Sequence, residues 1–236
     1  MLETIYTIPV NEAFDRCASD HSVGCPFCNL RATLEENELE LILGASMMEP
    51  DVRIKTNELG FCRDHYDKMF NRKNRLGLAL MLESHLDEIG KNFAPGGLAA
   101  VFRGDTSAER LKKLDESCYV CGRIDYSLTK MIENAVYLWE ADSGARTNPF
   151  EEKIKAQPYI CLPHYSRFIE TGRDSLHKKK FPVFREVITA VVLEYFEELK
   201  RDVSWFCKKF DYRYENEPWG NSKDAVERAI KFICGS

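Results

Sequence analysis

The sequence predicts a mainly α-helical fold, and three observations lead to this prediction. Apolar residues recur at three- and four-residue steps over long stretches, strand-like alternation is nearly absent, and one cysteine and histidine pattern occurs twice. The 236 residues are 44% hydrophobic and 30% charged, a composition typical of folded globular proteins. We therefore expect long amphipathic helices that pack together, with two pseudo-repeated CxxC…CxxH units that are each clamped by a metal ion.

Three long helices are indicated by their apolar stripes. The first continues from near Cys62 and carries Leu78, Leu82, Leu86, Ile89 and Phe93. The second carries Ile124, Leu128, Met131, Ala135, Leu138 and Trp139. The third carries Phe184, Ile188, Val191, Tyr195, Leu199, Val203 and Phe206. Residues at these steps share one face of an α-helix, so each helix is expected to bury one side.

Shorter signals indicate the remaining elements. The stretch TIYTIPV near the N-terminus is the one candidate strand. Pro50 and Pro149 suit the first turns of short helices, because proline has no N–H to lose there. Asn221 or Ser222 is expected to cap a last short helix. The apolar face of that helix comprises Val226, Ala229, Ile230 and Ile233.

A glycine- and proline-rich segment predicts where the chain divides. APGGLAAVFRGDTSAER, which begins at Ala94, carries three glycines and a proline between two helical units. We expect an N-terminal helical unit over 1–97 with the first CxxC…CxxH site. A C-terminal helical unit over 98–236 would carry the second site and the last helix. The two units are expected to pack either separately or as one domain.

The repeated pattern supplies eight candidate metal ligands. Its first copy comprises Cys25, Cys28, Cys62 and His65, and its second comprises Cys118, Cys121, Cys161 and His164. The spacers between the pairs are 33 and 39 residues long, which exceeds the roughly 12–20 residues typical of small zinc fingers. Each ion is therefore expected to clamp the ends of longer helices rather than create a miniature fold.

The residue types and their spacing favour zinc. Zinc takes four ligands in a tetrahedron and prefers thiolate sulfur and imidazole nitrogen, and a two-residue gap brings two side chains to one ion. Chance predicts only ~0.2 C-x-x-H pairs in such a chain. We predict two structural zinc ions, because four protein ligands leave no open position for substrate; an iron–sulfur cluster is the alternative. Duplication favours pairing of the four ligands within each copy, although the spacing also permits pairing across the copies.

The stretches TIPVNEAF, CPFC, GFCRDHY and KFDYRYENEPWG resemble a bacterial domain family of unknown function that has paired CPxC and GFCxxH elements and a C-terminal KFDYR…EPWG motif. The similarity spans nearly the whole chain. The second copy reads YICLPHY instead of GFCxxH, which keeps the ligands and changes the approach to the helix. The family has no established activity, so the resemblance supports the cysteine and histidine assignments alone.

The KKFDYRYENEPWG segment is a candidate ligand or partner surface. A forked guanidinium and rigid aromatic rings suit recognition of a carboxylate, a phosphate or a protein. Its candidate residues are Lys209, Asp211, Tyr212, Arg213 and Trp219. The structural alternative is that Phe210, Tyr212 and Trp219 anchor the last helix while Asp211 and Arg213 pair with neighbouring groups.

Several other positions are expected to be ordinary structural residues. His85 lies on an apolar stripe and is expected to be a satisfied core histidine. Cys17 and His21 are expected to be ordinary side chains, with extra metal ligands as the alternative. Cys207 and Cys234 occupy apolar helical positions and are expected to be buried thiols. His177–Lys180 are expected to form a solvated turn, with a nucleic-acid contact as the alternative.

Composition limits the function classes. A net charge of −5 offers no overall field for nucleic acid, and the sequence lacks both a signal-peptide pattern and an apolar run of the ~20 residues that a membrane span needs. Nine cysteines without such a signal indicate the cytoplasm. The absence of common catalytic motifs favours an interaction or adaptor module with a protein partner. Alternatives are an enzyme or redox protein that uses one metal or iron–sulfur site or a pocket near the KFDYR…EPWG segment, and a nucleic-acid-binding protein.

Overall fold

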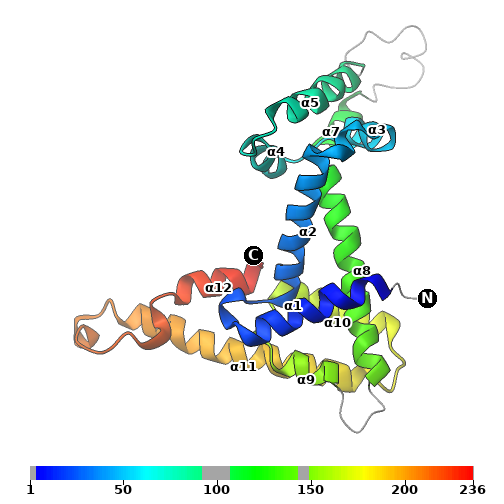
Figure 1. Cartoon of the computed structure of the whole chain (residues 1–236). Helices are drawn as coiled ribbons and strands as arrows, with labels where there is room; N and C mark the ends of the chain where they lie inside the picture. Colours follow the sequence, from blue (N-terminus) through cyan, green and yellow to red (C-terminus); the bar gives the residue numbers. More distant parts are fainter. Residues whose placement is uncertain (1–3, 92–106, 143–148, 236) are drawn as a thin grey trace. The chain divides into compact units, whose positions relative to one another are not determined.

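A computed structural model describes residues 4–91, 107–142 and 149–235 of the chain (Figure 1). Every regular element in these ranges is an α-helix or a short 3-10 helix, and they contain no strand. The predicted mainly α-helical fold is therefore confirmed. No helix in these ranges combines the length and the apolar composition that crossing a lipid bilayer requires.

The chain divides into two compact units. Unit 1 comprises residues 1–32 and 128–236, and unit 2 comprises residues 33–127. The boundary falls within α2 (Pro26–Leu43) and α8 (Tyr119–Asp142), so each of these helices contributes residues to both units. This division differs from the expected split after residue 97. Most of the glycine-rich segment that predicted the split lies outside the described residues.

Unit 1 has an aromatic core. Phe27 contacts Phe14 and Phe168 with ring centroids 5.5 and 5.0 Å apart, and Phe184 contacts Phe168 and Trp139 at 4.9 and 5.1 Å. Edge-to-face pairs of this kind add about 0.5–1.5 kcal/mol each beyond the burial of their area. Besides its parts of α2 and α8, the unit contains α1 (Thr7–Ser19), α9 (Pro149–Lys155), α10 (Leu162–Ser175), α11 (Phe181–Lys208) and α12 (Ala225–Cys234). Its 3-10 helices are η1 (Thr4–Tyr6), η2 (His21–Val23), η4 (Tyr212–Tyr214) and η5 (Gly220–Ser222).

Unit 2 has a core of mostly aliphatic side chains with two aromatic rings. Besides its parts of α2 and α8, it contains η3 (Ala45–Met48), α3 (Pro50–Leu59), α4 (Arg63–Phe70), α5 (Arg75–Gly90) and α7 (Ser107–Asp115). The buried core residues are Leu39, Ile42, Leu43, Phe61, Met69, Leu78, Met81, Tyr119, Val120 and Ile124. They come from α2, α4, α5 and α8, and Phe61 directly precedes Cys62. The candidate ligand Cys62 therefore lies at the edge of this core.

Several predicted elements are confirmed. The second and third apolar stripes lie on α8 and α11. Pro50 and Pro149 are the first residues of α3 and α9, as their missing N–H groups suggest. Lys178–Lys180 form a turn before α11.

Three local predictions are wrong. The candidate strand TIYTIPV is η1 and the start of α1, where Pro9 lies in the first turn and its missing N–H costs no helical bond. The single helix expected from Cys62 onward is two helices. Asn74 caps α5 by accepting the N–H of Gly77 at 2.9 Å, and it donates to the Leu43 carbonyl at 2.5 Å. This capping side chain begins a new helix instead of extending α4.

The last helix also begins and packs differently. α12 starts after Asp224, whose carboxylate accepts from the Arg228 Nε–H at 3.0 Å and does not cap the backbone. Asn221 and Ser222 are the last two residues of η5. The buried face of α12 carries Ala225 and Phe232. Of the predicted apolar face, Val226, Ile230 and Ile233 are exposed.

Candidate metal centres

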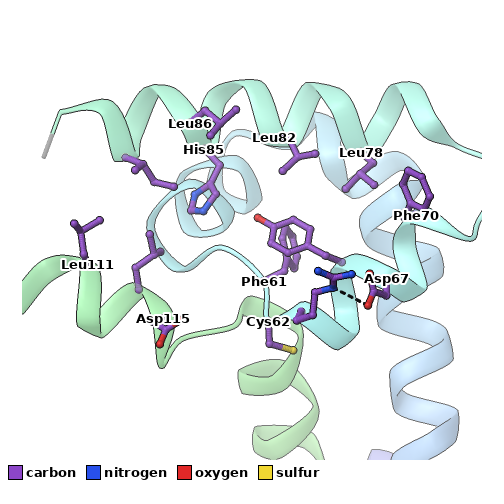
Figure 2. A pocket seen from close by; sticks show the side chains of 14 residues that line it. Phe61, Cys62, Asp67, Phe70, Leu78, Leu82, His85, Leu86, Leu111 and Asp115 are labelled. Carbon is purple, nitrogen blue, oxygen red and sulfur yellow. Dashed lines mark hydrogen bonds and ion pairs between the residues drawn. The ribbon is translucent and has the colours of Figure 1, made fainter. Parts of the chain in front are cut away.

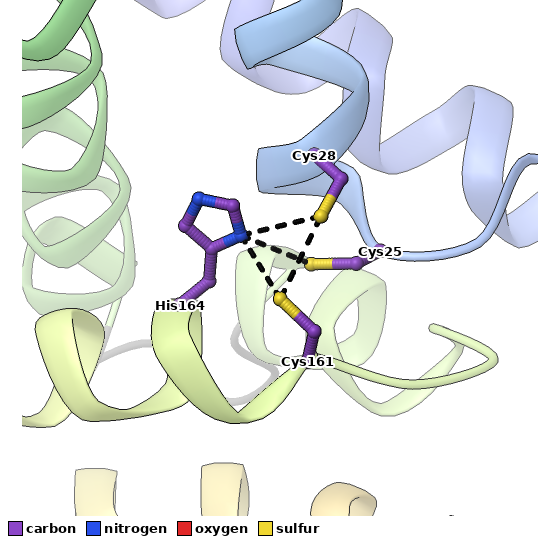
Figure 3. Close-up of side chains that lie close together, drawn as sticks. All are labelled: Cys25, Cys28, Cys161 and His164. Carbon is purple, nitrogen blue, oxygen red and sulfur yellow. Dashed lines mark hydrogen bonds between the residues drawn. The ribbon is translucent and has the colours of Figure 1, made fainter. Parts of the chain in front are cut away.

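The eight predicted ligands form two groups of four, but the groups cross the two copies of the pattern. Cluster 1 comprises Cys25, Cys28, Cys161 and His164 (Figure 3), and cluster 2 comprises Cys62, His65, Cys118 and Cys121. Within each group the candidate ligand atoms all lie within 4.8 Å of one another. The expectation that ligands pair within each copy is therefore wrong. Neither copy of the sequence pattern supplies all four ligands of one cluster.

The length of α2 explains the crossed pairing. Cys25 and Cys28 lie at its first turn, and its 18 residues span roughly 27 Å. The last residues of α2 pack with Phe61 in the core of unit 2. The continuous helix therefore carries the chain away from the first CxxC pair before it reaches Cys62 and His65. All ligands of cluster 1 belong to unit 1, and all ligands of cluster 2 belong to unit 2.

The start of a helix positions each of the four ligand pairs in the same way. In each pair the first ligand immediately precedes a helix and the second lies in its first turn, so two side chains three residues apart project from one helix N-terminus. The carbonyl of each first ligand accepts an N–H four residues on. These bonds join Asn29 to Cys25, Tyr66 to Cys62, Gly122 to Cys118 and Tyr165 to Cys161 at 3.1, 3.0, 3.0 and 2.8 Å. Two helix N-termini thus face each cluster, and their dipoles favour thiolate over thiol.

A tight backbone turn precedes one CxxC pair and one CxxH pair. Gly24 comes directly before Cys25 with φ +85°, and Gly60 comes two residues before Cys62 with φ +57°. A Cβ atom at Gly24 would lie 2.7 Å from Tyr159 Oη, and one at Gly60 would lie 2.6 Å from His85 Nε2. Only glycine satisfies both the positive φ and the close approach at these positions.

The atoms of cluster 1 have the separations expected around one ion. His164 Nδ1 lies 3.1, 3.4 and 3.8 Å from the sulfur atoms of Cys161, Cys28 and Cys25 (Figure 3), and the Cys28 and Cys161 sulfurs are 3.6 Å apart. Ligands bound to zinc at about 2.0–2.3 Å in a tetrahedron lie about 3.5–3.8 Å apart. The Cys28–Cys161 and His164–Cys25 distances fall in this range, and the other two distances are shorter by a few tenths of an ångström. The donor set and the geometry therefore fit a tetrahedral ion.

Cluster 1 is buried on all sides. Its four ligands are buried, and the His164 ring lies 5.8 Å from the Phe27 ring. The chain also returns to this site at its end. A Cβ atom built at Gly235, which has φ +80°, would lie 3.7 Å from the sulfurs of both Cys28 and Cys161.

Burial and mutual contact shift the pKa values of Cys25 and Cys28 in opposite directions. Burial raises the pKa of Cys25 well above its ordinary value, and its contacts with Cys161 and Cys28 raise it further. The pKa of Cys28 is lowered, because Cys161, Cys25 and His164 stabilise its thiolate through hydrogen bonds. The side chains alone therefore favour one thiolate among several thiols. A divalent cation would supply the charge that three thiolates need in this buried site.

Cluster 2 repeats the geometry of cluster 1 in a more open setting. His65 Nδ1 lies 3.1, 3.3 and 3.4 Å from the sulfurs of Cys62, Cys118 and Cys121, and the Cys62 and Cys121 sulfurs are 3.8 Å apart. His65 is buried, Cys62 and Cys118 are half-buried, and Cys121 is exposed. The donor set again fits a tetrahedral ion, and Cys121 is its most exposed ligand residue.

Glu35 orients the histidine of cluster 2. Its Oε1 lies 3.2 Å from His65 Nε2, and its other oxygen accepts a hydrogen bond from Lys68. A carboxylate on Nε2 holds the proton there and leaves the Nδ1 lone pair for a metal ion. Among the described residues, His164 has no such carboxylate. Sequence reasoning did not find Glu35, because its only signal was membership of the acidic stretch EENELE in α2.

Comparison with known proteins gives one result. The family described as "Family of unknown function (DUF6062)" matches residues 1–236. The chain belongs to this family. The match confirms the resemblance seen in CPFC, GFCRDHY and KFDYRYENEPWG, and it brings no activity because the family has none assigned. Neither the curated proteins nor the solved structures contain a match.

In this DUF6062 member a buried lysine holds the loop after α11. Lys209 Nζ donates to the carbonyls of Tyr214, Glu215 and Glu217 at 2.6, 2.8 and 2.6 Å, and it lies 5.4 Å from the centroid of the Trp219 ring. Lys209 is 9% exposed. Lys209 therefore supports the loop from inside, and the half-buried Trp219 ring packs beside its charge.

The outer side of the same loop carries the other candidate residues. Arg213 and Asp211 form a two-pronged ion pair with each other, as the structural alternative expected. Phe210 and Tyr212 do not anchor the last helix, because they are 75% and 84% exposed. The loop thus presents two aromatic side chains to solvent on a backbone that Lys209 fixes.

The other predicted structural residues are partly confirmed. His85 is buried, and its Nδ1–H donates to the Asn57 carbonyl at 2.8 Å. Cys17 is buried outside both clusters, and burial raises its pKa to about 11. His21 is also outside both clusters. The prediction that Cys207 and Cys234 are buried is wrong, because both are exposed.

An apolar cavity of about 780 Å³ adjoins cluster 2 within unit 2 (Figure 2). Leu78, Leu82 and Leu86 of α5 line it together with Phe61, whereas the Cys62 sulfur points away from these side chains (Figure 2). Its histidine is His85, which already bonds the backbone of Asn57. The lining is largely apolar, and Arg63, Tyr66, Asp67 and Asp115 add polar groups to it.

Proposed function

We propose that the protein binds two zinc ions, one in each cluster. The observation that carries this proposal is the convergence of eight cysteine and histidine side chains from four helix N-termini into two Cys3His sets. Their separations of 3.1–3.8 Å suit a single ion. Thiolates around an iron–sulfur cluster bind several iron atoms and need more room, so zinc is favoured over the cluster.

Both ions are structural in this proposal. Four protein ligands complete the tetrahedron and leave no position for water or substrate. Cluster 1 joins the start of α2 to the start of α10, and cluster 2 joins the start of α4 to the start of α8. Since these starts are far apart in the sequence, each ion fastens two helices of its own unit.

Elemental analysis of protein purified without added metal tests the proposal. We expect two zinc ions per chain, one ion in Cys28→Ser and one ion in Cys118→Ser. Cys207→Ser is the matched control and should retain two ions, because Cys207 is a free thiol outside both clusters. Iron in place of zinc, or a wild-type chain that binds no metal, would refute it.

We further propose that the protein works as an interaction module, with a protein as its partner. Tyrosine and other aromatic side chains on a rigid backbone are typical of binding hot spots, and the exposed Phe210 and Tyr212 meet that description. The sequence carries no common catalytic motif and has a net charge of −5, which disfavours enzymes and nucleic-acid binding. All nine cysteines lie in the described ranges and none of them forms a disulfide, which supports placing the protein in a reducing compartment, the cytoplasm.

The interaction proposal requires a partner whose binding depends on this loop. We expect Phe210→Ser combined with Tyr212→Ser to weaken a purified partner's binding at least about tenfold, a typical cost for hot-spot residues, while zinc content is unchanged. Tyr126→Ser is the matched control, because Tyr126 is 60% exposed and lies on α8 away from the loop sequence. Turnover of a small molecule that is lost on a pocket substitution at constant metal content would contradict this proposal.

A further inference from the structure

The two clusters differ in how solvent reaches their sulfur atoms. The three cysteines of cluster 1 are buried, and a Cβ atom built at Gly235 would lie 3.7 Å from two of their sulfurs. In cluster 2, Cys121 is exposed, and Cys62 and Cys118 are half-buried. The ligand sets are otherwise identical, so access is the principal chemical difference between the sulfur atoms.

Access decides the reactivity of metal-bound sulfur. A cysteine that binds zinc does so as a thiolate, which is the nucleophilic form that attacks peroxides and other electrophiles. Susceptibility to oxidation follows thiolate character and exposure together. Cluster 2 meets both conditions when it holds zinc, whereas cluster 1 meets only the first.

We propose that cluster 2 is an oxidant-sensitive site, at which a hydroperoxide oxidises Cys121 and expels the zinc ion while cluster 1 keeps its own ion. This inference rests on the proposed zinc binding. It adds a chemical role that the two sites do not share. Cluster 1 keeps its zinc ion, whereas cluster 2 releases its ion when a two-electron oxidant reacts with its cysteines.

The reaction proceeds in two steps. The Cys121 thiolate attacks one oxygen of hydrogen peroxide, which breaks the O–O bond, releases hydroxide and leaves Cys121 as a sulfenic acid. The Cys62 sulfur lies 3.8 Å from the Cys121 sulfur. Its thiolate attacks the sulfenic sulfur and releases a second hydroxide. Two thiolates are thereby oxidised to a disulfide, and one peroxide is reduced. The zinc ion keeps its charge of +2 throughout. It leaves because Cys118 and His65 are the only ligands that remain, and two ligands do not retain it.

The structural consequence is confined to the junction of α4 and α8. The Tyr119 N–H donates to the Gly60 carbonyl at 3.0 Å and the Ser117 hydroxyl donates to the Leu59 carbonyl at 2.7 Å, so two backbone contacts near the cluster survive loss of the ion. The Phe61 and Tyr119 rings, whose centroids are 6.4 Å apart, lose the ion that fixes the adjacent helix ends. Unit 2 loosens there, and unit 1 does not.

The test follows zinc release and cysteine oxidation together. The protein carries Cys207→Ser and Cys234→Ser, which remove the exposed thiols outside the clusters. Hydrogen peroxide is added in the presence of a chromogenic zinc indicator, and oxidised cysteines are mapped by mass spectrometry. We expect one ion to leave at least about tenfold faster than the other, with Cys62 and Cys121 oxidised and Cys25, Cys28 and Cys161 intact. A thiol reductant with added zinc should restore two ions per chain.

Cys121→His separates oxidation from simple lability, because imidazole binds zinc and peroxide does not convert it to a disulfide. We expect this variant to keep two ions under the same peroxide treatment. Release of both ions at the same rate, earlier release from cluster 1, or unchanged loss of zinc from Cys121→His would overturn the inference and leave zinc binding intact. Fewer than two ions before peroxide is added would instead overturn the proposed zinc binding.

Discussion

Clusters 1 and 2 use the same four residue types and the same helix-start device, yet they lie in different surroundings. Cluster 1 has buried sulfurs and no carboxylate on its histidine among the described residues, whereas cluster 2 has an exposed Cys121 and a Glu35 partner for His65. The local sequence therefore brings two candidate ligands together at each helix start. The surrounding helices fix how tightly that ion is held and what reaches it.

Loss of one ligand is the largest change and tests whether each cluster serves its own unit. We expect Cys161→Ser to cost about 3 kcal/mol or more of the free energy of unfolding of unit 1, because it leaves three ligands buried without an ion. Cys62→Ser should loosen unit 2 instead. Hydrogen exchange measured along the chain distinguishes the two outcomes. Equal loosening of both units by either variant would break the assignment of one cluster to one unit.

Cys17→Ser is the matched control for that pair of variants. Cys17 is buried in unit 1 and belongs to neither cluster. The substitution places a hydroxyl in the same core without removing a ligand. It should retain two zinc ions per chain, so any loss of metal from it would indicate that packing, and not ligation, controls zinc content.

Removal of metal by a chelator should separate the clusters in time. A ligand sphere that is open to solvent lets a competing chelator approach, and a buried one requires local opening first. We therefore expect two phases of zinc loss to excess chelator, at least about tenfold apart, with the faster phase absent from Cys62→Ser. Absorbance of the chelator complex follows both phases. A single phase in the wild-type protein would erase the difference that burial predicts.

Glu35→Gln tests the support of His65. An amide cannot hold the Nε2 proton as a carboxylate does, so we expect cluster 2 to bind zinc about 10–100-fold more weakly. Competition with a chelator of known affinity measures this change. Glu36→Gln is the matched control, because Glu36 is the neighbour of Glu35 in α2 and forms an ion pair with Arg72. Equal effects of the two variants would show that charge near the cluster matters and the contact with Nε2 does not.

Much of the site could be predicted from the sequence, because its chemistry is local. Two ligands separated by two residues at a helix start meet one ion whatever the rest of the chain does. The partner of each pair could not be predicted, since it depends on α2 continuing for 18 residues into unit 2. Glu35 was missed for the same reason, because its contact with His65 joins residues 30 positions apart.

Burial was harder to predict than helicity. The stripe on α11 was correct, yet Cys207 near its end is exposed. Likewise, the apolar residues of α12 predict a helix, but Phe232 and Ala225 form its buried side while Ile230 and Ile233 face solvent. Periodicity indicates which residues share a face, and the tertiary structure decides which face is covered.

The smallest expected effects come from the glycines that precede the ligands. Gly24→Ala and Gly60→Ala each place a Cβ at a positive φ and within 2.7 and 2.6 Å of a side-chain atom, so each should cost about 1–3 kcal/mol of the free energy of unfolding. The neighbours differ, because Tyr159 stacks on Tyr195 at 4.5 Å whereas His85 bonds the Asn57 carbonyl. Gly122→Ala is the control, since Gly122 lies in α8 with open space around it. Thermal unfolding measures the change in stability, and metal analysis should show both ions retained in all three variants. Loss of cluster 2 zinc from Gly60→Ala alone would show that the two clusters also differ in how strongly they depend on the backbone turn before their ligands.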